Sequence, residues 1–144
     1  MKHTAALVLL FVAACSRPPS GGGLTGAENP RAAVQRFLAA ARAQDMQAIS
    51  VVWGNTKGPQ REQIERVELE KREQIMIALL RHDQSTISEP RNAPDGRLTV
   101  IVELKQGART ASPWFTLARG PSNRWYVEDF DLVTLQNKGF GSKP

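Results

Sequence analysis

The sequence has one cysteine, few aromatic residues and no long apolar run. Cys15 is the single cysteine among 144 residues, and aromatic residues make up 6% of the chain. One cysteine cannot form an internal disulfide, and it cannot build a structural zinc site alone. No apolar stretch reaches the roughly 18 residues that a membrane-spanning helix needs. These shortages exclude disulfide-stapled, zinc-stabilised and membrane-spanning folds.

The charge balance of the chain is basic but mixed. It carries 19 Lys and Arg residues against 14 Asp and Glu residues, a formal net charge of +5. So small an excess, together with 41% hydrophobic residues, is typical of a folded protein and not of a disordered polycation. The length predicts one folded domain.

The first 15 residues have the pattern of an export signal. A short positive segment, MKH, precedes an uninterrupted apolar stretch over residues 5–14. A stretch of this length matches the hydrophobic region of a signal peptide and is about half of a membrane span. It leads directly into the segment Val12-Ala13-Ala14-Cys15.

This segment resembles the lipobox of bacterial lipoproteins, in which an aliphatic residue and two small residues precede an invariant cysteine. The resemblance implies that residues 1–14 are a signal peptide, that the chain is cleaved before Cys15, and that the Cys15 thiol is acylated. Each buried methylene contributes about 0.8 kcal/mol, so two or more acyl chains anchor a protein stably in the lipid bilayer. The alternatives are an ordinary signal peptide cut near Ala13 and Ala14, or a Cys15 buried in the core.

An acylated Cys15 implies a lipid-anchored protein on the bacterial cell membrane or outer membrane, with its domain facing the periplasm or the cell exterior. Ser16 replaces the Asp that would oppose outer-membrane sorting in a Gram-negative host. Residues 16–26 are rich in Pro, Gly and Ser and have no hydrophobic period, as is typical of linkers. The sequence thus predicts a lipidated cysteine and flexible linker over residues 15–27, ahead of a folded domain over residues 28–135.

Three helices are predicted at the start of the domain. Asn29 and Pro30 are favoured as the cap and first residue of a helix, and Asp45 caps a short second helix that ends at Gly54. A third helix is expected over residues 59–81, and its charged first half is interpreted as a solvated face. Apolar residues follow the first cap at helical spacing, at Val34, Phe37, Leu38 and Ala41. The inward seam of the third helix is predicted at Ile64, Val67 and Lys71.

The apolar period changes from 3.6 to 2 after the third helix, which indicates strands. Four strands are expected, over residues 84–89, 98–105, 110–119 and 124–135. Residues 136–144 are expected to form a loose tail. Three helices followed by a four-stranded antiparallel sheet predict an α+β fold, with the N-terminal helices packed on one concave face of the sheet.

The order of these elements resembles small lipoproteins of the NTF2-like, cystatin-like-fold superfamily. The resemblance covers residues 28–135 and implies a curved sheet around the first and third helices, with a conical pocket. The superfamily contains ketosteroid isomerases, polyketide cyclases and dehydratases as well as non-catalytic members, so the fold alone assigns no function. The matching positions are Pro30, Val34, Phe37, Asp45 and Trp125-Tyr126-Val127.

Four residues are candidates for such a pocket: Tyr126, Asp129, Glu103 and His82. An isomerase-like site needs a carboxylate base and a hydrogen-bond donor for the oxyanion. Tyr126 and Asp129 are three residues apart, so an ideal strand places them on opposite faces unless a bulge intervenes. His82 is more simply a charge partner at a helix C-terminus. The sequence shows neither a nucleophile triad nor a metal-ligand cluster, so no catalytic residue, metal or cofactor is assigned.

The lack of a catalytic constellation favours a membrane-anchored, non-catalytic domain that binds an unidentified ligand or envelope protein. The alternatives are an isomerase- or cyclase-type enzyme of the same fold and a structural accessory of envelope assembly. The basic excess lies between Arg91 and Arg124, which suits an anionic surface such as lipid headgroups, although a solvated surface without a partner has the same composition. Nucleic-acid binding is not expected, because aromatic and basic residues are not interleaved.

The lipobox interpretation makes Cys15 the attachment point of the lipid. The variant Cys15→Ser is expected to lose all incorporation of labelled palmitate, because serine lacks the soft thiol nucleophile that accepts the lipid. The measurement is the palmitate label carried by the protein in growing cells. Label retained on the variant would contradict the interpretation.

Overall fold

The computed structural model describes residues 24–142, and an α+β fold is confirmed there. The signal peptide, Cys15 and most of the expected linker lie outside the described residues. The helices are α1 (Pro30–Ala43), α2 (Met46–Val52), α3 (Arg66–Leu79) and a C-terminal α4 (Leu132–Asn137). Two short strands, β1 (Gly54–Asn55) and β2 (Gly58–Pro59), form a small hairpin, and the 3-10 turn η1 (Gln60–Glu62) follows.

The main sheet is antiparallel and has six strands instead of the expected four. Its order is β3-β5-β7-β8, and β4 and β6 also pair with β5. Pro113 separates β6 from β7, because proline has no backbone N–H to donate to the sheet. Both strands nevertheless pair with β5 in one continuous register. Pro90 lies between β3 and β4, which pair with β5 in registers that differ by one residue. The strands are β3 (Gln84–Ile87), β4 (Arg91–Asn92), β5 (Leu98–Gln106), β6 (Arg109–Ala111), β7 (Trp114–Arg119) and β8 (Trp125–Phe130).

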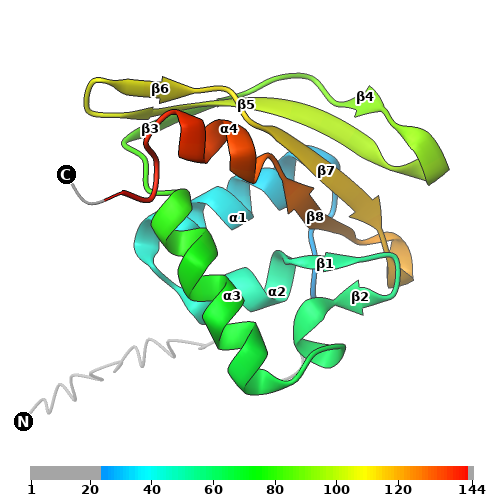
Figure 1. Cartoon of the computed structure of the whole chain (residues 1–144). Helices are drawn as coiled ribbons and strands as arrows, with labels where there is room; N and C mark the ends of the chain where they lie inside the picture. Colours follow the sequence, from blue (N-terminus) through cyan, green and yellow to red (C-terminus); the bar gives the residue numbers. More distant parts are fainter. Residues whose placement is uncertain (1–23, 143–144) are drawn as a thin grey trace, which may run out of the picture.

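The first helix begins as predicted. Asn29 Oδ1 accepts a hydrogen bond from the Ala32 backbone N–H at 2.8 Å, and Pro30 takes the first helical position. Val34 and Phe37 are fully buried on the face that meets the sheet. Figure 1 shows α1, α2 and α3 on one side of the sheet, so the helices form one layer and the sheet the other.

The core lies between these two layers and is centred on three phenylalanines. The ring centroids of Phe37 and Phe115 are 6.3 Å apart, those of Phe37 and Phe130 6.2 Å, and those of Phe115 and Phe130 5.5 Å. Aromatic pairs at these separations contribute about 0.5–1.5 kcal/mol beyond the burial of their area. The alternating residues of β5 face the same core, as the sequence predicts: Val100, Val102 and Leu104.

A bulge in β8 changes which residues face the core. Val127 pairs with Leu117 while Asp129 pairs with Thr116, so Glu128 is the extra residue. Because of this extra residue, Val127 and Phe130 both face the core although they are three residues apart. By the alternation of the pleat, Tyr126 and Asp129 then share the opposite face.

The third helix is shorter than expected. It begins at Arg66 instead of residue 59, because Pro59 pairs in β2 and the Glu65 side chain caps the helix at the Val67 N–H, at 3.0 Å. Gly54 is required at the start of the hairpin, since a Cβ there would lie 2.4 Å from the Gly58 carbonyl oxygen. The predicted inward seam is also wrong, because Val67 and Lys71 are exposed. The buried seam consists of Leu69, Glu73, Met76 and Leu80.

The C-terminal prediction is wrong in two respects. The last strand ends at Phe130, where the Asp131 carboxylate caps α4 by accepting from the Thr134 N–H at 2.9 Å. The tail is not loose, because Phe140 is buried in the core and Arg109 donates to the Gly139 carbonyl at 2.8 Å. The domain therefore continues past residue 135.

The N-terminal boundary also differs from the expected residue 28. Ala27 is fully buried and exchanges both backbone hydrogen bonds with Trp125, each at 2.8 Å. Arg124 donates to the carbonyls of Thr25 and Gly26, at 3.0 and 2.9 Å. The end of the expected linker is thus part of the domain. No helix within residues 24–142 has the length and apolar character to cross a membrane.

The burial of Phe140 predicts that the C-terminal segment stabilises the domain. Phe140→Ala is expected to lower the free energy of unfolding by about 3–4 kcal/mol, because truncation of a buried phenylalanine removes its contacts and leaves a cavity. Denaturant unfolding measures this change. Lys138→Ala, at an exposed position of the same segment, is the matched control and should change stability by less than about 0.5 kcal/mol. Equal effects of the two variants would contradict the assignment.

Candidate functional site

Tyr126 and Asp129, the first two predicted site residues, do not form a site together. Tyr126 is 2% exposed and its hydroxyl lies 2.7 Å from Thr25 Oγ1. Its ring is closely surrounded by backbone, since a Cβ at Gly54 or Gly120 would approach it to 2.7 or 2.8 Å. Asp129 is exposed, and its carboxylate accepts from the Phe130 N–H at 2.8 Å. Tyr126 therefore joins the N-terminal segment to the sheet, and Asp129 holds the local backbone.

Glu103 and His82 also serve local roles. Glu103 lies on the outward face of β5, with an oxygen 3.5 Å from Lys105 Nζ. His82 is buried, and its Nδ1 donates to the Leu80 carbonyl oxygen at 2.7 Å. This hydrogen bond closes the turn after α3. Each of the four predicted residues thus makes its own local contact, and no two of them form a catalytic dyad.

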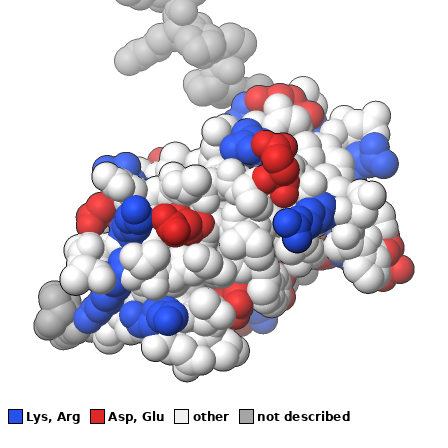
Figure 2. Space-filling model, turned by 90° about the horizontal axis from the view of Figure 1, so that it is seen from above, with Lys and Arg blue, Asp and Glu red and all other residues white. Residues whose placement is uncertain are grey.

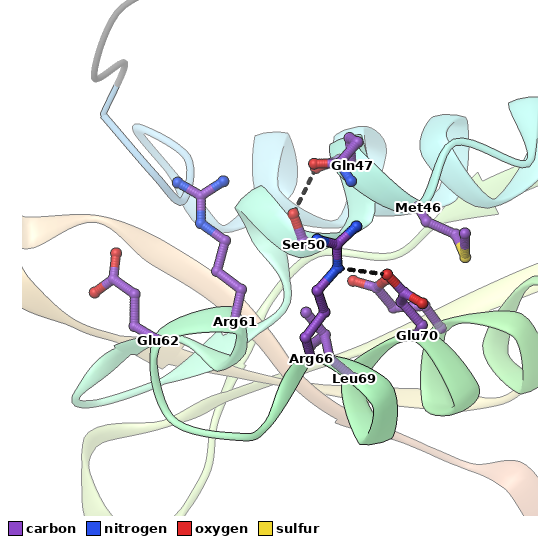
Figure 3. A pocket seen from close by; sticks show the side chains of 9 residues that line it. Met46, Gln47, Ser50, Arg61, Glu62, Arg66, Leu69 and Glu70 are labelled. Atoms are coloured by element: carbon purple, nitrogen blue, oxygen red, sulfur yellow. Dashed lines mark hydrogen bonds and ion pairs between the residues drawn. The ribbon is translucent and has the colours of Figure 1, made fainter.

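A pocket that the sequence does not predict lies between α2, η1 and α3. Its volume is about 480 Å³. Figure 3 shows Met46 and Ser50 extending from α2 toward α3, and Arg66 and Glu70 rising from α3 toward α2. Arg61 and Glu62 stand at the end formed by η1. The lining residues are Met46, Gln47, Ser50, Arg61, Glu62, Arg66, Leu69, Glu70 and Glu73.

Glu73 is the unusual residue of this pocket. It is 2% exposed and occupies a position of the buried α3 seam where an apolar residue would pack. Its Oε1 is fully buried and has no hydrogen-bond partner among the described residues. A buried polar atom without a partner costs about 1–3 kcal/mol, and a charged one costs more. This loss of folding stability arises at the wall of a pocket.

The environment of Glu73 favours its neutral form. Burial, and after it the neighbouring Glu70 carboxylate, together raise the pKa of its carboxyl from 4.5 to about 7. Desolvation penalises the charged carboxylate, and a second negative charge nearby adds to that penalty. The group therefore exchanges a proton near neutral pH.

The rim of the pocket carries charges of both signs. Arg66 Nε donates to Glu70 Oε1 at 2.9 Å, so this pair is internally balanced. Arg61 and Glu62 are exposed on η1, and α2 adds no charged residue to the lining. Within the described part of the chain, no group of three or more His, Cys, Asp or Glu side chains is placed to hold a metal ion. The arrangement suits the binding of a polar organic molecule.

In the sequence, Glu73 and most of the charged residues of this pocket belong to one run of charged residues. Residues 61–74 read as a solvated helical face, and Glu73 is one acidic residue among several. One signal was present, since Glu73 lies four residues after Leu69 and three before Met76, on the stripe that continues to Leu80. Reading that stripe as the core face identifies Glu73 as a charged residue in an apolar row.

The basic residues predicted to form a surface, between Arg91 and Arg124, mostly contact other groups of the domain. Five of the six cations from Arg91 to Arg124 make contacts within the domain. The partners are Glu128 for Arg97, Glu103 for Lys105, the Gly139 carbonyl for Arg109, the Trp125 ring (5.6 Å to its centroid) for Arg119, and the Thr25 and Gly26 carbonyls for Arg124. Figure 2 shows blue and red side chains interspersed on the face seen from above. That face carries mixed charge.

Comparison with known proteins assigns no family to the chain. No family model matches the sequence. No curated protein matches it either. The site must therefore be interpreted from its own chemistry.

The raised pKa of Glu73 predicts how stability depends on pH. A carboxyl that binds its proton more tightly in the folded state contributes most below pH 4.5, and that contribution is lost as pH rises toward 7. We expect the difference in unfolding free energy between the wild type and Glu73→Gln to change by about 2–3 kcal/mol between pH 4.5 and pH 8, in favour of the variant at pH 8.

Denaturant unfolding at several pH values measures this difference. Glu62→Gln removes an exposed carboxylate from the same pocket and is the matched control for the loss of a negative charge there. A wild-type–Glu73→Gln difference that stays constant across this pH range would show that the Glu73 carboxyl titrates normally.

Proposed function

We propose that this protein is a lipid-anchored envelope lipoprotein whose domain binds a small ligand, without catalysis, in the pocket between α2, η1 and α3. The observation that carries the proposal is the buried, unpartnered Oε1 of Glu73 in the wall of that pocket. Burial of a polar group without a hydrogen-bond partner costs stability, and an apolar residue in the same place would not carry this cost. Features that cost stability in this way are concentrated at functional sites.

A bound ligand would supply what Glu73 lacks. A donor group on the ligand completes the hydrogen bonding of Oε1 and excludes the remaining water from the pocket. Each hydrogen bond to a charged group contributes about 1.5–3 kcal/mol when it is desolvated. Ser50, Met46 and Leu69 provide a mixed polar and apolar wall around this contact, which is the usual composition of a small-molecule site.

The finer fold assignment, an NTF2-like domain, belongs to the same proposal. It is supported by the burial of Val34 and Phe37 on α1, by the capping of α2 by Asp45, and by the antiparallel sheet that follows the three helices. The candidate site differs from the conical pocket that the resemblance implies, because α2 and α3 line it and the core face of the sheet does not.

The position of the tether supports a location of the pocket near the membrane. Thr25 and Glu62 line one small cleft, and Glu62 also lines the candidate pocket. The chain therefore leaves the domain beside η1. Thr25 is ten positions after Cys15 in the sequence, a span of at most about 35 Å when extended. A lipid on Cys15 would hold Thr25 within this distance of the bilayer and the η1 side of the domain close to the membrane.

An enzyme of the same fold is the second candidate, and the titration of Glu73 near neutral pH favours it. A general acid or base works best with a pKa near the working pH. Such an enzyme also needs a nucleophile or oxyanion donor beside the carboxyl. The hydroxyl of Ser50 already donates to the Gln47 carbonyl at 2.8 Å, so it is engaged in the helix. The binding role requires no further group.

The proposed function is tested by blocking the pocket. Detergent-solubilised full-length protein is heated in the presence of four probes, namely β-alanine, phosphoethanolamine, glucose and indole, and thermal unfolding is followed by differential scanning fluorimetry. We expect at least one probe to raise the midpoint, since a ligand that binds the native state stabilises it. Gln47→Trp, at an exposed position of the pocket wall, should abolish this shift.

Gln74→Trp is the matched control, because Gln74 is exposed on α3 outside the pocket lining. It should retain the full shift of the wild type. Stabilisation by no probe, or stabilisation that survives in Gln47→Trp, would reject the pocket as the binding site.

A further inference from the structure

The negative charge around Glu73 favours a ligand that carries a cationic group there. The neighbouring Glu70 carboxylate makes the surroundings of Glu73 more negative, although Arg66 partly balances it at 2.9 Å. A neutral donor could bond Oε1, but a cationic donor also gains the attraction of the negative site. A primary ammonium group has three donors and one charge on a compact head, so it fits a single buried carboxylate.

At the η1 end of the pocket, the side chain of Arg61 favours an anionic group on the ligand. Arg61 is exposed there and has no ion-pair partner among the described residues, whereas the guanidinium of Arg66 is held by Glu70. Figure 3 shows the Arg61 side chain extending from η1 on the side away from Met46. An arginine is suited to a carboxylate or phosphate group, which it binds with two parallel hydrogen bonds.

These two observations identify a ligand class. Resting on the proposed function, we propose that the pocket binds a small zwitterion, whose primary ammonium pairs with Glu73 and whose carboxylate or phosphate faces Arg61. The apolar side chains of Met46 and Leu69 also line the pocket and suit the short methylene chain that joins the two charges. A free molecule and the headgroup of a lipid share this chemistry.

The ammonium contact requires an ionised Glu73, which makes binding depend on pH. Glu70 is the charged neighbour that acts on the Glu73 carboxyl. The other charged residues of the pocket wall are Arg66 from α3 and Arg61 and Glu62 from η1, and α2 adds no charge to the lining. The pKa of Glu73 is raised to about 7 by burial and by Glu70. From pH 6 to pH 8 the ionised fraction of such a group rises about tenfold.

β-Alanine is the probe for this dependence, because both of its charges are constant between pH 6 and pH 8. Isothermal titration of full-length detergent-solubilised protein should show an affinity about ten times higher at pH 8 than at pH 6. Glu73→Gln should weaken binding at pH 8 at least tenfold, because the buried charge that pairs with the ammonium is lost. An affinity independent of pH, or retained in Glu73→Gln, would overturn the proposal.

Two further variants separate the ends of the ligand. Arg61→Gln should weaken β-alanine binding threefold or more and leave propylamine, which has no anionic group, unchanged. Glu89→Gln removes a remote carboxylate that pairs with Arg31 and should bind both probes as the wild type does. Equal loss of both probes in Arg61→Gln would overturn the assignment of Arg61 to the anionic end.

The source of the zwitterion is decided by a third comparison. Phosphoethanolamine in solution is compared with vesicles of phosphatidylethanolamine, using vesicles of phosphatidylglycerol as the control without an ammonium. Binding of the soluble compound supports a free ligand, and Glu73-dependent binding to phosphatidylethanolamine vesicles alone supports a headgroup. Failure of every ammonium probe while glucose or indole still binds in a Gln47→Trp-sensitive manner would overturn the ligand class and leave the proposed function intact.

Discussion

The packing of α1 against the sheet is the interaction on which the rest of the structure depends. Phe37 projects from α1 onto Phe115 and Phe130, and the three rings lie within 6.3 Å of one another. A helix and a sheet that each expose one apolar face cannot be stable apart, so burial of these rings fixes the two-layer arrangement. The bulge at Glu128 is part of this constraint, because it returns Phe130 to the core face.

The candidate pocket is a consequence of how α2 and α3 complete that core. The C-terminal half of α3 contributes Met76 and Leu80, which pack like any core residues. One turn earlier the same seam contains Glu73, and the packing between α2 and α3 gives way to a pocket. The Glu73 carboxyl therefore lies between the apolar core on one side and the pocket on the other. That position explains why its pKa is raised to about 7 and why an ammonium would suit it.

The ends of the domain are held by contacts with its core and sheet, and one of them uses the predicted site residue Tyr126. The hydroxyl of Tyr126 lies beside Thr25, and the backbone of Ala27 pairs with Trp125. At the other end Phe140 returns to the core. These contacts are structural, so residue types typical of catalysis are here used for packing and hydrogen bonding. They also place Thr25 in one cleft with Glu62, which also lines the candidate pocket.

The sequence by itself determined the local elements: the Asn29-Pro30 start of α1, the alternation of β5 and the α+β class. These follow from capping and periodicity, which act over a few neighbouring residues. The tertiary structure decided the bulge, the burial of Phe140 and the isolation of Glu73. Each depends on which distant segments come together, since burial and an unmet hydrogen bond are properties of the surroundings. Whether a glutamate in a charge run is buried at a pocket wall, as Glu73 is, depends on how α2, η1 and α3 pack together.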